Sequence, residues 1–476
     1  MINEVEIDSI EELGRDEVWD ISFLKDENFY LKEPNFIANN ILVHNCHAAG
    51  IVISDIPLSE IAPLRTSNKG LATQFPYEDL ESIGLIKFDI LAISTLTVIQ
   101  KTVEMIKENY GIDIDVKNLP LNDSKTFDLY KSGHLSGVFQ CENKGMQETI
   151  QEIEADCFSD IMAAIALYRP GPMVSIPEYC ARKKGLKNVE YFHPALEKHV
   201  KPYLKSTYGV AVFQEQIMQI CNALAGFSVT DGYIMIKGIG KKKQHIIDKF
   251  KSQFIDGCGG NGLPAPLAEE YWEKFITPFA SYGFNAAHAA GYGYLSYITA
   301  YLKANYTDEF MCSYLNVENH RKKHDKIKVL ERDLKRFGID LLEKNVNVCG
   351  TDYRIKRKKD LNSGIEKTEI IPSLMCKGVG VDAANELESK QPYKDLRDMA
   401  YRTDTDKVVQ DTISSLVEDG FYDNTFKEIN RKLKKGQKIK KDQFVQMMVD
   451  KFVSLRKDIL KNKKRGIGPE SLEGLF

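Results

Sequence analysis

Three adjacent residues, His44, Asn45 and Cys46, have the most definite chemistry in this sequence. An asparagine side-chain amide can attack its own main-chain carbonyl and cleave the peptide bond that follows. A neighbouring histidine can donate or accept the protons of that step, and a cysteine after the cut can hold an acyl group as a thioester. The triplet therefore predicts cleavage after Asn45 and acyl transfer to Cys46. A strand end followed by an ordinary loop is the alternative.

A second candidate site lies in the apolar run from Ile83 to Leu91. The run predicts a β-strand, and alternation along a strand places Lys87 and Asp89 on one face. Carboxylate oxygens are ligands that Mg²⁺ prefers, and a lysine beside the metal can contact a phosphate oxygen. The pair therefore predicts a Mg²⁺-phosphate site with Asp89 as metal ligand and Lys87 as its basic companion. A surface ion pair is the alternative.

Several basic residues stand beside sequence breaks, where they can reach an anionic ligand. Arg169 precedes Pro170-Gly171-Pro172, and its planar guanidinium can bind a phosphate through two hydrogen bonds. Gly238 and Gly240 lead into Lys241-Lys242-Lys243, where backbone N–H and ammonium groups can face one anion. The candidate phosphate-binding residues are Arg169, Lys237, Lys241, Lys242 and His288. A solvated turn is the alternative for the lysines, and a structural role is the alternative for the histidine.

A glycine-containing segment, Lys377-Gly378-Val379-Gly380, is predicted to join two helices. Glycine permits a tight turn there, and the N–H groups at the start of the second helix can bind a DNA phosphate without reading sequence. Lys377, Gly378 and Gly380 are therefore candidate DNA-binding residues. A plain connection between helices is the alternative.

The elements that must position these residues are predicted from the residue pattern. The segment Trp19–Phe23 alternates apolar and polar residues and predicts a half-buried strand, and Ile41-Leu42-Val43 predicts a second strand. An amphipathic helix is predicted after the strand of the second candidate site. Ser94 or Thr95 can cap this helix at its start, and Gly111 ends it.

The composition bounds the class of protein. The chain has 476 residues, of which 43% are apolar and 28% charged, and this length corresponds to about three domains. No apolar run approaches the roughly 18 residues of a membrane span and no signal peptide is present, so we predict no membrane association. Nine cysteines are scattered without a Cys-x-x-Cys pair, which favours reduced thiols in a cytoplasm and argues against a zinc site.

Charge is unevenly distributed, although the net charge is only −4. Residues 1–45 contain 11 acidic and three basic residues, whereas residues 426–465 contain 15 basic and four acidic residues. The second segment suits a polyanionic partner such as DNA. A solvated charge run is the alternative.

Several long motifs resemble the palm and fingers of family C, the alpha subunits of bacterial DNA polymerase III. They are HAAGIVIS (47–54), IGLIKFDILAISTLT (83–97), GVFQCENKGM (137–146), ALYRPGPM (166–173), YGVAVFQEQIMQI (208–220), GIGKKK (238–243) and YGFNAAHAAGYGYLSYITAYLKANY (282–306). The resemblance extends from residue 46 to about residue 425.

This resemblance implies an enzyme that extends DNA primers from dNTPs with two Mg²⁺ ions. In the family three Asp residues hold the metals, and Asp89 matches the third of them. The first two belong to an upstream Asp-x-Asp, which we expect in a partner chain. This sequence departs from the family at Ile236-Lys237, where an Arg pair is usual, and at Ala286-Ala287, where a Lys is usual.

Residues 1–45 resemble the C-terminal fragment of an intein, which ends in His-Asn before a nucleophilic residue. Asp20 matches the Asp of an intein strand, and Cys46 matches the residue that receives the acyl group. Glu27 and Pro34 stand at the two positions where a further His would be expected, which predicts slow splicing or a substituting role for Glu27. We therefore predict a split intein that splices in trans with a polypeptide carrying its N-terminal half.

These expectations define a multidomain α+β fold. Its predicted parts are a small all-β split-intein fragment (1–45), the C-terminal part of a palm β-sheet (46–125), mostly α-helical fingers (126–320), a helix-hairpin-helix DNA-binding region (321–425), and a basic helix with a tail (426–476). In the tail, Leu472, Leu475 and Phe476 fall at i, i+3 and i+4 and can face one groove. This tail resembles the sliding-clamp-binding peptide of phage polymerases.

The overall prediction is the C-terminal half of a cytoplasmic DNA polymerase III alpha subunit, bacterial or phage-encoded. Its predicted partners are an N-terminal polymerase and intein fragment, primer-template DNA, dNTPs and a sliding clamp. The alternative is a non-catalytic DNA- and clamp-binding subunit that associates with its partner without splicing.

Overall fold

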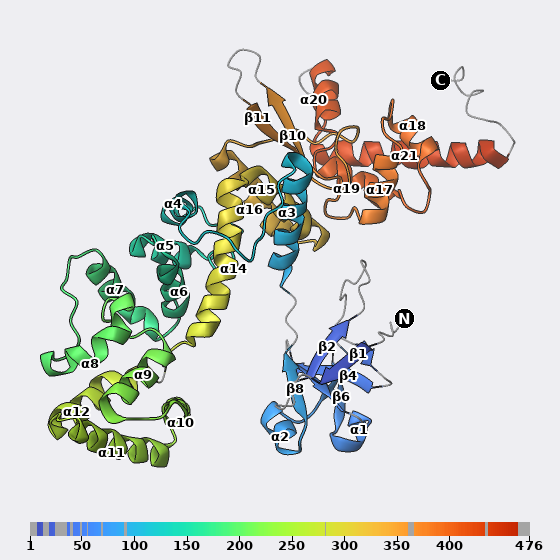
Figure 1. Cartoon of the computed structure of the whole chain (residues 1–476). Helices are drawn as coiled ribbons and strands as arrows, with labels where there is room; N and C mark the ends of the chain where they lie inside the picture. The colour runs from blue at the N-terminus through green and yellow to red at the C-terminus, as the bar shows by residue number, and fades with distance from the viewer. Residues whose placement is uncertain are drawn as a thin grey trace. The chain divides into compact units, whose positions relative to one another are not determined.

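The computed structural model describes most of the chain. The described residues are 7–12, 19–23, 36–38, 41–47, 50–54, 56–67, 70–89, 93–280, 282–359, 366–433 and 437–464. The chain divides into two compact units, Met1–Ile93 and Ser94–Phe476. Small antiparallel sheets make up most of the first unit, whereas helices dominate the second (Figure 1). The predicted α+β fold class is therefore confirmed.

Strands dominate the first unit. Two hairpins are formed by β1 (Ile7–Glu12) with β2 (Trp19–Phe23) and by β6 (Leu64–Ser67) with β7 (Gly70–Thr73). The four-stranded sheet has antiparallel neighbours in the order β3 (Phe36–Ala38), β4 (Ile41–His47), β5 (Gly50–Ile53) and β8 (Ile86–Asp89). Two helices, α1 (Leu58–Ile61) and α2 (Tyr77–Ser82), lie between these strands in the chain. The strands predicted at residues 19–23 and 41–43 are thus confirmed. The strand predicted over 83–91 begins only at Ile86, because residues 83–85 form the turn after α2, and residues 90 and 91 lie outside the described residues.

Strand β4 contains the predicted cleavage site, the bond between Asn45 and Cys46. His44 pairs with Val52 and Asn45 with Ile51, and the register then shifts between Asn45 and His47. Such a bulge adds one residue to one strand and locally disrupts the ladder of hydrogen bonds. The boundary predicted between residues 45 and 46 therefore lies inside one strand, at an irregular point of its pairing with β5.

Helices make up most of the second unit. Its first half contains α3 (Ser94–Tyr110), α4 (Ser124–Ser132), α5 (Lys144–Ile153), α6 (Phe158–Leu167), η1 (Pro172–Ser175), α7 (Ile176–Lys183), α8 (Pro194–Leu204), η2 (Lys205–Thr207), α9 (Gln214–Ala225), α10 (Val229–Gly240), α11 (Gln244–Gly260), α12 (Ala265–Tyr271), η3 (Trp272–Ile276) and α13 (Thr277–Ala280). Its second half contains α14 (Ala286–Asn305), α15 (Thr307–His320), α16 (His324–Leu334), η4 (Lys335–Phe337), β9 (Asp340–Leu341), β10 (Arg354–Lys359), β11 (Glu366–Ile371), α17 (Val381–Ser389), α18 (Leu396–Arg402), α19 (Gln410–Glu418), α20 (Asp423–Lys432) and α21 (Lys441–Lys464). The predicted helix start at Ser94 and its end before Gly111 are confirmed.

The largest apolar core of the second unit surrounds α14, which packs against α3, α4, α6 and α15 (Figure 1). Lys303 of α14 is fully buried in this core, and its Nζ donates hydrogen bonds to the carbonyls of His134 and Ser136 at 2.8 and 2.7 Å. Burial lowers the pKa of Lys303 to about 7. This lysine therefore ties the loop before α5 to α14 from the inside.

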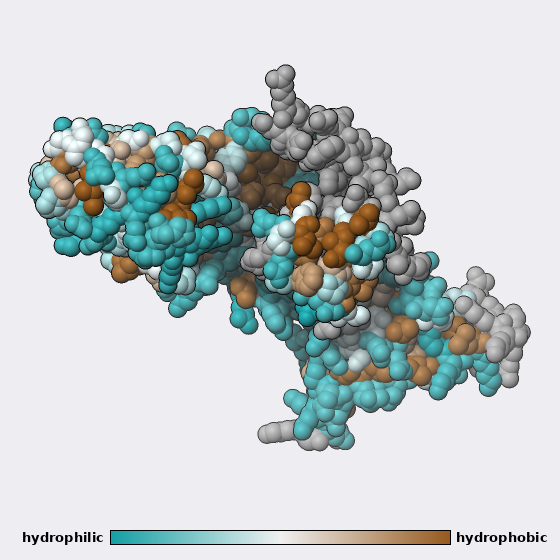
Figure 2. All heavy atoms as spheres, turned by 90° about the horizontal axis from the view of Figure 1, so that it is seen from below, coloured by the Kyte–Doolittle hydropathy of each residue, from teal (hydrophilic) through white to brown (hydrophobic). Residues whose placement is uncertain are grey.

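Two further cores complete the second unit. One lies among α8 to α13 and contains Trp272 and Phe254, and the other lies among α17 to α21 and contains Phe444 and Phe452. Figure 2 shows a largely hydrophilic face with isolated apolar patches on the part that holds α8 to α12. Among the described residues, no helix combines the length and the apolar character needed to span a membrane.

The turn Lys377–Gly380 enters α17 from β11 and a short irregular segment. The prediction that this turn joins two helices is therefore wrong on its first side, because the residues before it are not helical. A second glycine turn does join two helices: Gly420, with φ of 99°, lies between α19 and α20. The two turns belong to one packed region, since a Cβ on Gly378 would lie 2.1 Å from the Ser415 Oγ of α19.

We predict that Gly378→Ala destabilises the core formed by α17 to α21 by roughly 1–3 kcal/mol. Gly378 has φ of +96° and no room for a methyl group against Ser415, whereas Gly380 has φ of −85° and open space around its Cα. Gly380→Ala is therefore the matched control. Amide hydrogen exchange in α17 and α19 should become faster in the first variant only, and equal exchange in the two variants would contradict this packing.

Candidate functional site

The predicted metal ligand Asp89 ends strand β8 and pairs with Gly50 at the start of β5. Lys87 lies two residues earlier on the same strand and pairs with Val52. Alternation places Lys87 and Asp89 on one face of the sheet, as the sequence predicted. The neighbour of Asp89 on β5 is a glycine, which carries no side chain. The side chains of Lys87 and Asp89 themselves lie outside what the structure describes.

Arg169 lies between α6 and η1, and its guanidinium is already engaged by the protein. Nε donates to the carbonyl of Ala166 at 2.9 Å, and Nη2 donates to the carbonyl of Tyr282 at 2.7 Å. The guanidinium also stacks on Phe284, with Cζ 4.4 Å from the ring centroid. Burial lowers the pKa of Arg169. A bidentate phosphate contact along the Nε–Nη2 edge is therefore excluded unless these bonds break, but Nη1 has no acceptor among the described residues.

His288 lies in the first turn of α14 and also contacts Phe284. Its ring centroid is 5.3 Å from that of Phe284 and 4.2 Å from that of Tyr292. Its side chain is exposed, and its backbone N–H is capped by the side chain of Asn285 at 2.7 Å. The structure thus brings Arg169 and His288 to one aromatic residue, although they are 119 positions apart in the sequence. The motifs alone did not reveal this meeting.

Glu215 is a residue of this region that the sequence reasoning missed. Its carboxylate accepts hydrogen bonds from Asn285 Nδ2 and from the backbone N–H of Ala286, both at 2.8 Å. A carboxylate at a helix start satisfies N–H groups that have no partner within the helix. Glu215 therefore fixes the start of α14, and with it the position of His288. The available signal was an acidic residue in the motif VFQEQIM, at the beginning of α9.

Two tyrosines of α14 serve in packing. The hydroxyl of buried Tyr297 donates to the carbonyl of Pro120 at 2.6 Å, and that of Tyr294 donates to the carbonyl of Val116 at 3.0 Å. Tyr292 differs, because its ring lies against His288 and, at 5.3 Å between centroids, against Phe139. Tyr292 is therefore the member of the series closest to the candidate phosphate contacts.

The three candidate lysines lie at the corner between α10 and α11. Lys237, Lys241 and Lys242 are all exposed, and the Lys237 Nζ lies 4.6 Å from the centroid of the Tyr233 ring. The predicted anion cradle of backbone N–H groups is wrong, because the N–H groups of residues 241, 242 and 243 donate to carbonyls of α10. Gly238 is helical and packs against Ile246, where a Cβ would lie 2.4 Å from a side-chain carbon. At this corner only the ammonium groups of the three lysines can therefore contact an anion.

Helix α9 connects the two groups of candidate residues. Its first turn holds Glu215 against the start of α14, and the helix packs against α10 and α11. The remaining candidate DNA-binding residues, Lys377, Gly378 and Gly380, are exposed at the turn before α17. The candidate clamp-binding residues Leu472, Leu475 and Phe476 lie outside the described residues.

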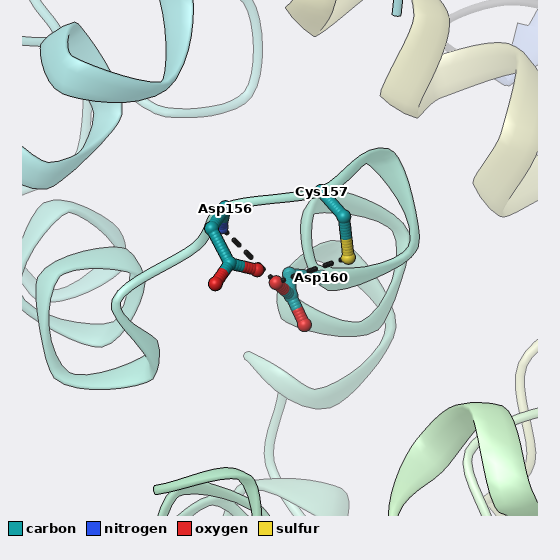
Figure 3. A group of neighbouring side chains, drawn as sticks. All are labelled: Asp156, Cys157 and Asp160. Carbon is teal, nitrogen blue, oxygen red and sulfur yellow. Dashed lines mark hydrogen bonds between the residues drawn. The ribbon is translucent and has the colours of Figure 1, made fainter. Parts of the chain in front are cut away.

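One group of potential metal ligands occurs among the described residues, at Asp156, Cys157 and Asp160 (Figure 3). Buried Asp160 accepts hydrogen bonds from the Lys183 Nζ at 2.5 Å and from the Tyr179 hydroxyl at 3.0 Å. It also accepts from the Cys157 thiol and the Asp156 N–H, as the dashed lines in Figure 3 show. The ammonium group of Lys183 already neutralises the carboxylate that a metal ion would bind, so we interpret this cluster as structural.

Comparison with known families identifies most of the described chain. The sequence model of the bacterial DNA polymerase III alpha subunit finger domain matches residues 95–262. The model of the bacterial DNA polymerase III alpha NTPase domain matches residues 37–92, which begin inside the segment predicted as an intein fragment. A helix-hairpin-helix motif matches residues 338–433, a range that includes both glycine turns.

Comparison with curated proteins gives the same result. DNA polymerase III subunit alpha of Aquifex aeolicus is 39% identical over 389 residues, which are 80% of this chain and 32% of that protein. The corresponding subunit of Thermus aquaticus is 37% identical over 379 residues, which are 79% of this chain and 30% of that protein. The chain therefore spans about a third of the length of the curated relatives that it matches.

We predict that Asp160→Asn destabilises the helical unit by roughly 1–3 kcal/mol at neutral pH, because Lys183 loses its buried partner and keeps only the exposed Asp156, at 3.0 Å, as a counter-charge. Burial alone would raise the pKa of Asp160, but the hydrogen bond and charge of Lys183 outweigh it and hold that pKa below its ordinary value. The contribution of this pair to the free energy of unfolding is therefore present above the pKa of Asp160 in the unfolded chain. It is lost as the pH falls through the lower pKa of Asp160 in the folded protein.

Thermal unfolding against pH checks both statements. The double variant Asp160→Asn/Lys183→Met is the control, and it should recover part of the lost stability because no charge stays buried. Equal stability of wild type and Asp160→Asn at neutral pH would contradict this role of the ion pair.

Proposed function

Because this chain carries a region of the bacterial DNA polymerase III alpha subunit, its finger domain included, we propose that it is the C-terminal part of a DNA-directed DNA polymerase. The observation that carries the proposal is the extent of the similarity: 37–39% identity continues over about four fifths of the chain. Unrelated function is hard to reconcile with several motifs kept in order, from the strand of Asp89 to the helix-hairpin-helix region.

Asp89 is the proposed metal ligand of the polymerase centre. Asp89 stands at a strand end beside Gly50 of the next strand, and its carboxylate offers the oxygen donors that Mg²⁺ prefers. Two Mg²⁺ ions, when bound, would stabilise charge on the attacking 3′-oxygen and on the leaving pyrophosphate. Lys87, on the same strand face, is proposed to contact a phosphate oxygen. The two further carboxylates that such a centre requires are proposed to come from an N-terminal segment.

The finger residues are proposed to bind the triphosphate of the incoming dNTP. Arg169 offers Nη1, His288 offers an exposed imidazole beside it, and Lys241 and Lys242 offer exposed ammonium groups at the α10–α11 corner. Each of these cations can offset charge on a phosphate oxygen. Glu215 takes a positioning role, because it fixes the helix start that carries His288. Lys377, Gly378 and Gly380 are proposed to contact the DNA backbone, and the C-terminal tail a sliding clamp.

We also propose that residues 1–45 act as an intein fragment that joins this chain to the N-terminal segment on another polypeptide. In the proposed sequence, the partner carries its acyl group as a thioester or ester on the nucleophile of its own intein half. The Cys46 sulfur attacks that carbonyl, the partner's nucleophile leaves as a thiol or hydroxyl, and a thioester forms on Cys46. The Asn45 side-chain nitrogen then attacks its own carbonyl carbon, which breaks the Asn45–Cys46 bond and forms a succinimide. The released Cys46 amine attacks the thioester, so that an amide forms and the thiol is restored. His44 is proposed to move the protons.

The strand arrangement supports this junction. Cys46 stands at the shifted register between Asn45 and His47, where the pairing of β4 with β5 is interrupted, and bulges of this kind often re-aim a side chain at a reactive site. Cys46 lies on β4, which pairs with β5, and the other edge of β5 pairs with β8, the strand that ends at Asp89. Ligation at Cys46 would thus attach the partner's chain to the same sheet as the metal ligand.

The rival function is a non-catalytic DNA- and clamp-binding subunit that associates without splicing. Intact mass of the protein from its native host separates the two. Loss of residues 1–45 together with added N-terminal polypeptide supports ligation, whereas a persistent full-length chain supports the rival.

We predict that Asn45→Ala blocks the release of residues 1–45 and the final amide ligation, because alanine has no nucleophilic amide; the thioester on Cys46 is the last species that can form. The chain is mixed with a polypeptide that ends in an N-terminal intein half, and the product is followed by mass. Glu27→His is the informative companion variant and should accelerate splicing if a histidine normally assists there. Ligation by Asn45→Ala at the wild-type rate would contradict the proposed mechanism.

In the ligated protein, we predict that Asp89→Asn lowers primer extension by at least about a thousandfold, since a neutral amide replaces a metal ligand. Asp113→Asn is the matched control, because Asp113 is an exposed residue that pairs with Lys107 at 2.9 Å. Single-nucleotide incorporation is the measurement. Loss of activity by a similar factor in both variants would argue against a specific role for Asp89.

A further inference from the structure

A basic groove lies at the corner between α15 and α16. Six cationic side chains line it: Arg321, Lys322, Lys323, Lys326, Lys328 and Lys377. Five of them come from the α15–α16 corner, and the sixth comes from the glycine turn before α17. Segments about fifty residues apart in sequence thus converge on one surface. The acidic residues of the groove are Glu318 and Asp325.

Internal ion pairs neutralise only part of this charge. Glu318 is fully buried and pairs with Arg321 at 2.9 Å and with Lys326 at 3.5 Å. Lys326 also pairs with Glu142 at 3.1 Å. The other four lysines of the groove are exposed, and none has a carboxylate within ion-pair distance among the described residues. The groove therefore keeps a net positive charge that an external anion can neutralise.

The backbone holds the lysines of the corner in place. Lys322 adopts a left-handed φ of 57°, which is uncommon for a residue other than glycine. Its N–H donates to the carbonyl of Asn319 at 2.9 Å, and the N–H of Lys323 donates to the carbonyl of Glu318 at 3.0 Å. These bonds close the C-terminus of α15. The two lysines therefore stand on a defined turn rather than on a free loop.

The composition of the groove indicates what kind of anion fits it. Every described residue that lines it is charged or histidine, and His324 is the one aromatic residue among them. Binding of single-stranded bases relies on aromatic stacking platforms, and sequence reading relies on side chains that reach base edges. A surface of ammonium groups instead suits a continuous row of phosphates.

We propose that this groove binds the phosphate backbone of double-stranded DNA, as a track continuous with the glycine turn at Gly378. Lys377 belongs to both features, so a strand that contacts the turn passes directly into the groove. The inference rests on the proposed DNA-binding function of the chain and adds a contact surface outside the helix-hairpin-helix motif. It requires no sequence preference in the DNA.

The test is duplex binding by the full chain, measured by fluorescence anisotropy over a salt series. Lys323→Ala/Lys328→Ala should lower affinity roughly tenfold at 0.1 M salt and reduce the slope of log affinity against log salt by about one for each lysine. Lys377→Ala should reduce the slope by about one. The losses should be the same for duplexes of unrelated sequence. Since these side chains are exposed, the thermal midpoint should not change.

Lys198→Ala/Lys205→Ala is the matched control, because it removes two exposed lysines of α8 and η2 that have no carboxylate partner among the described residues. Equal affinity and slope in the groove variant and this control would overturn the inference while leaving the proposed function intact. A larger loss for single-stranded than for duplex DNA would overturn the proposed partner. If the wild-type chain binds no duplex at all, the inference and the proposed DNA binding fail together.

Discussion

The pairing of β5 with both β4 and β8 is the interaction on which the proposed chemistry depends. In this register Asn45 faces Ile51 on one side of β5, and Asp89 faces Gly50 on the other. The proposed ligation site and the proposed metal ligand are therefore held in one antiparallel sheet. Because a slip of one residue would turn every side chain to the opposite face, this register also decides which face of the sheet Lys87 and Asp89 share.

In the helical unit, buried charges hold the fold while exposed charges are left for ligands. Lys303 and the Asp160–Lys183 pair are buried and saturated by protein partners, so they fix loops and helices rather than bind anything. By contrast, the lysines at the α10–α11 corner and in the groove of α15 and α16 have exposed ammonium groups. Arg169 is intermediate: two of its nitrogens hold the backbone and the third is left to meet an anion.

Local patterns predicted the elements well but not the partners of each side chain. Alternation in Trp19–Phe23 and the cap types around Ser94 and Gly111 gave the correct strand and helix, because these signals depend on neighbouring residues only. The anion cradle at residues 241–243 failed, since glycine and lysine next to each other do not reveal that the N–H groups close a helix end. The groove was missed because Lys377 meets Lys328 only through tertiary packing.

We propose that the active centre of this chain is completed only when an N-terminal segment is joined to it. Primer extension in the presence of Mg²⁺ by the purified chain, compared with the ligated protein at equal concentration, tests this claim most directly. We expect extension by the ligated protein and none by the chain with residues 1–45 still attached. Robust extension by the unligated chain would contradict it.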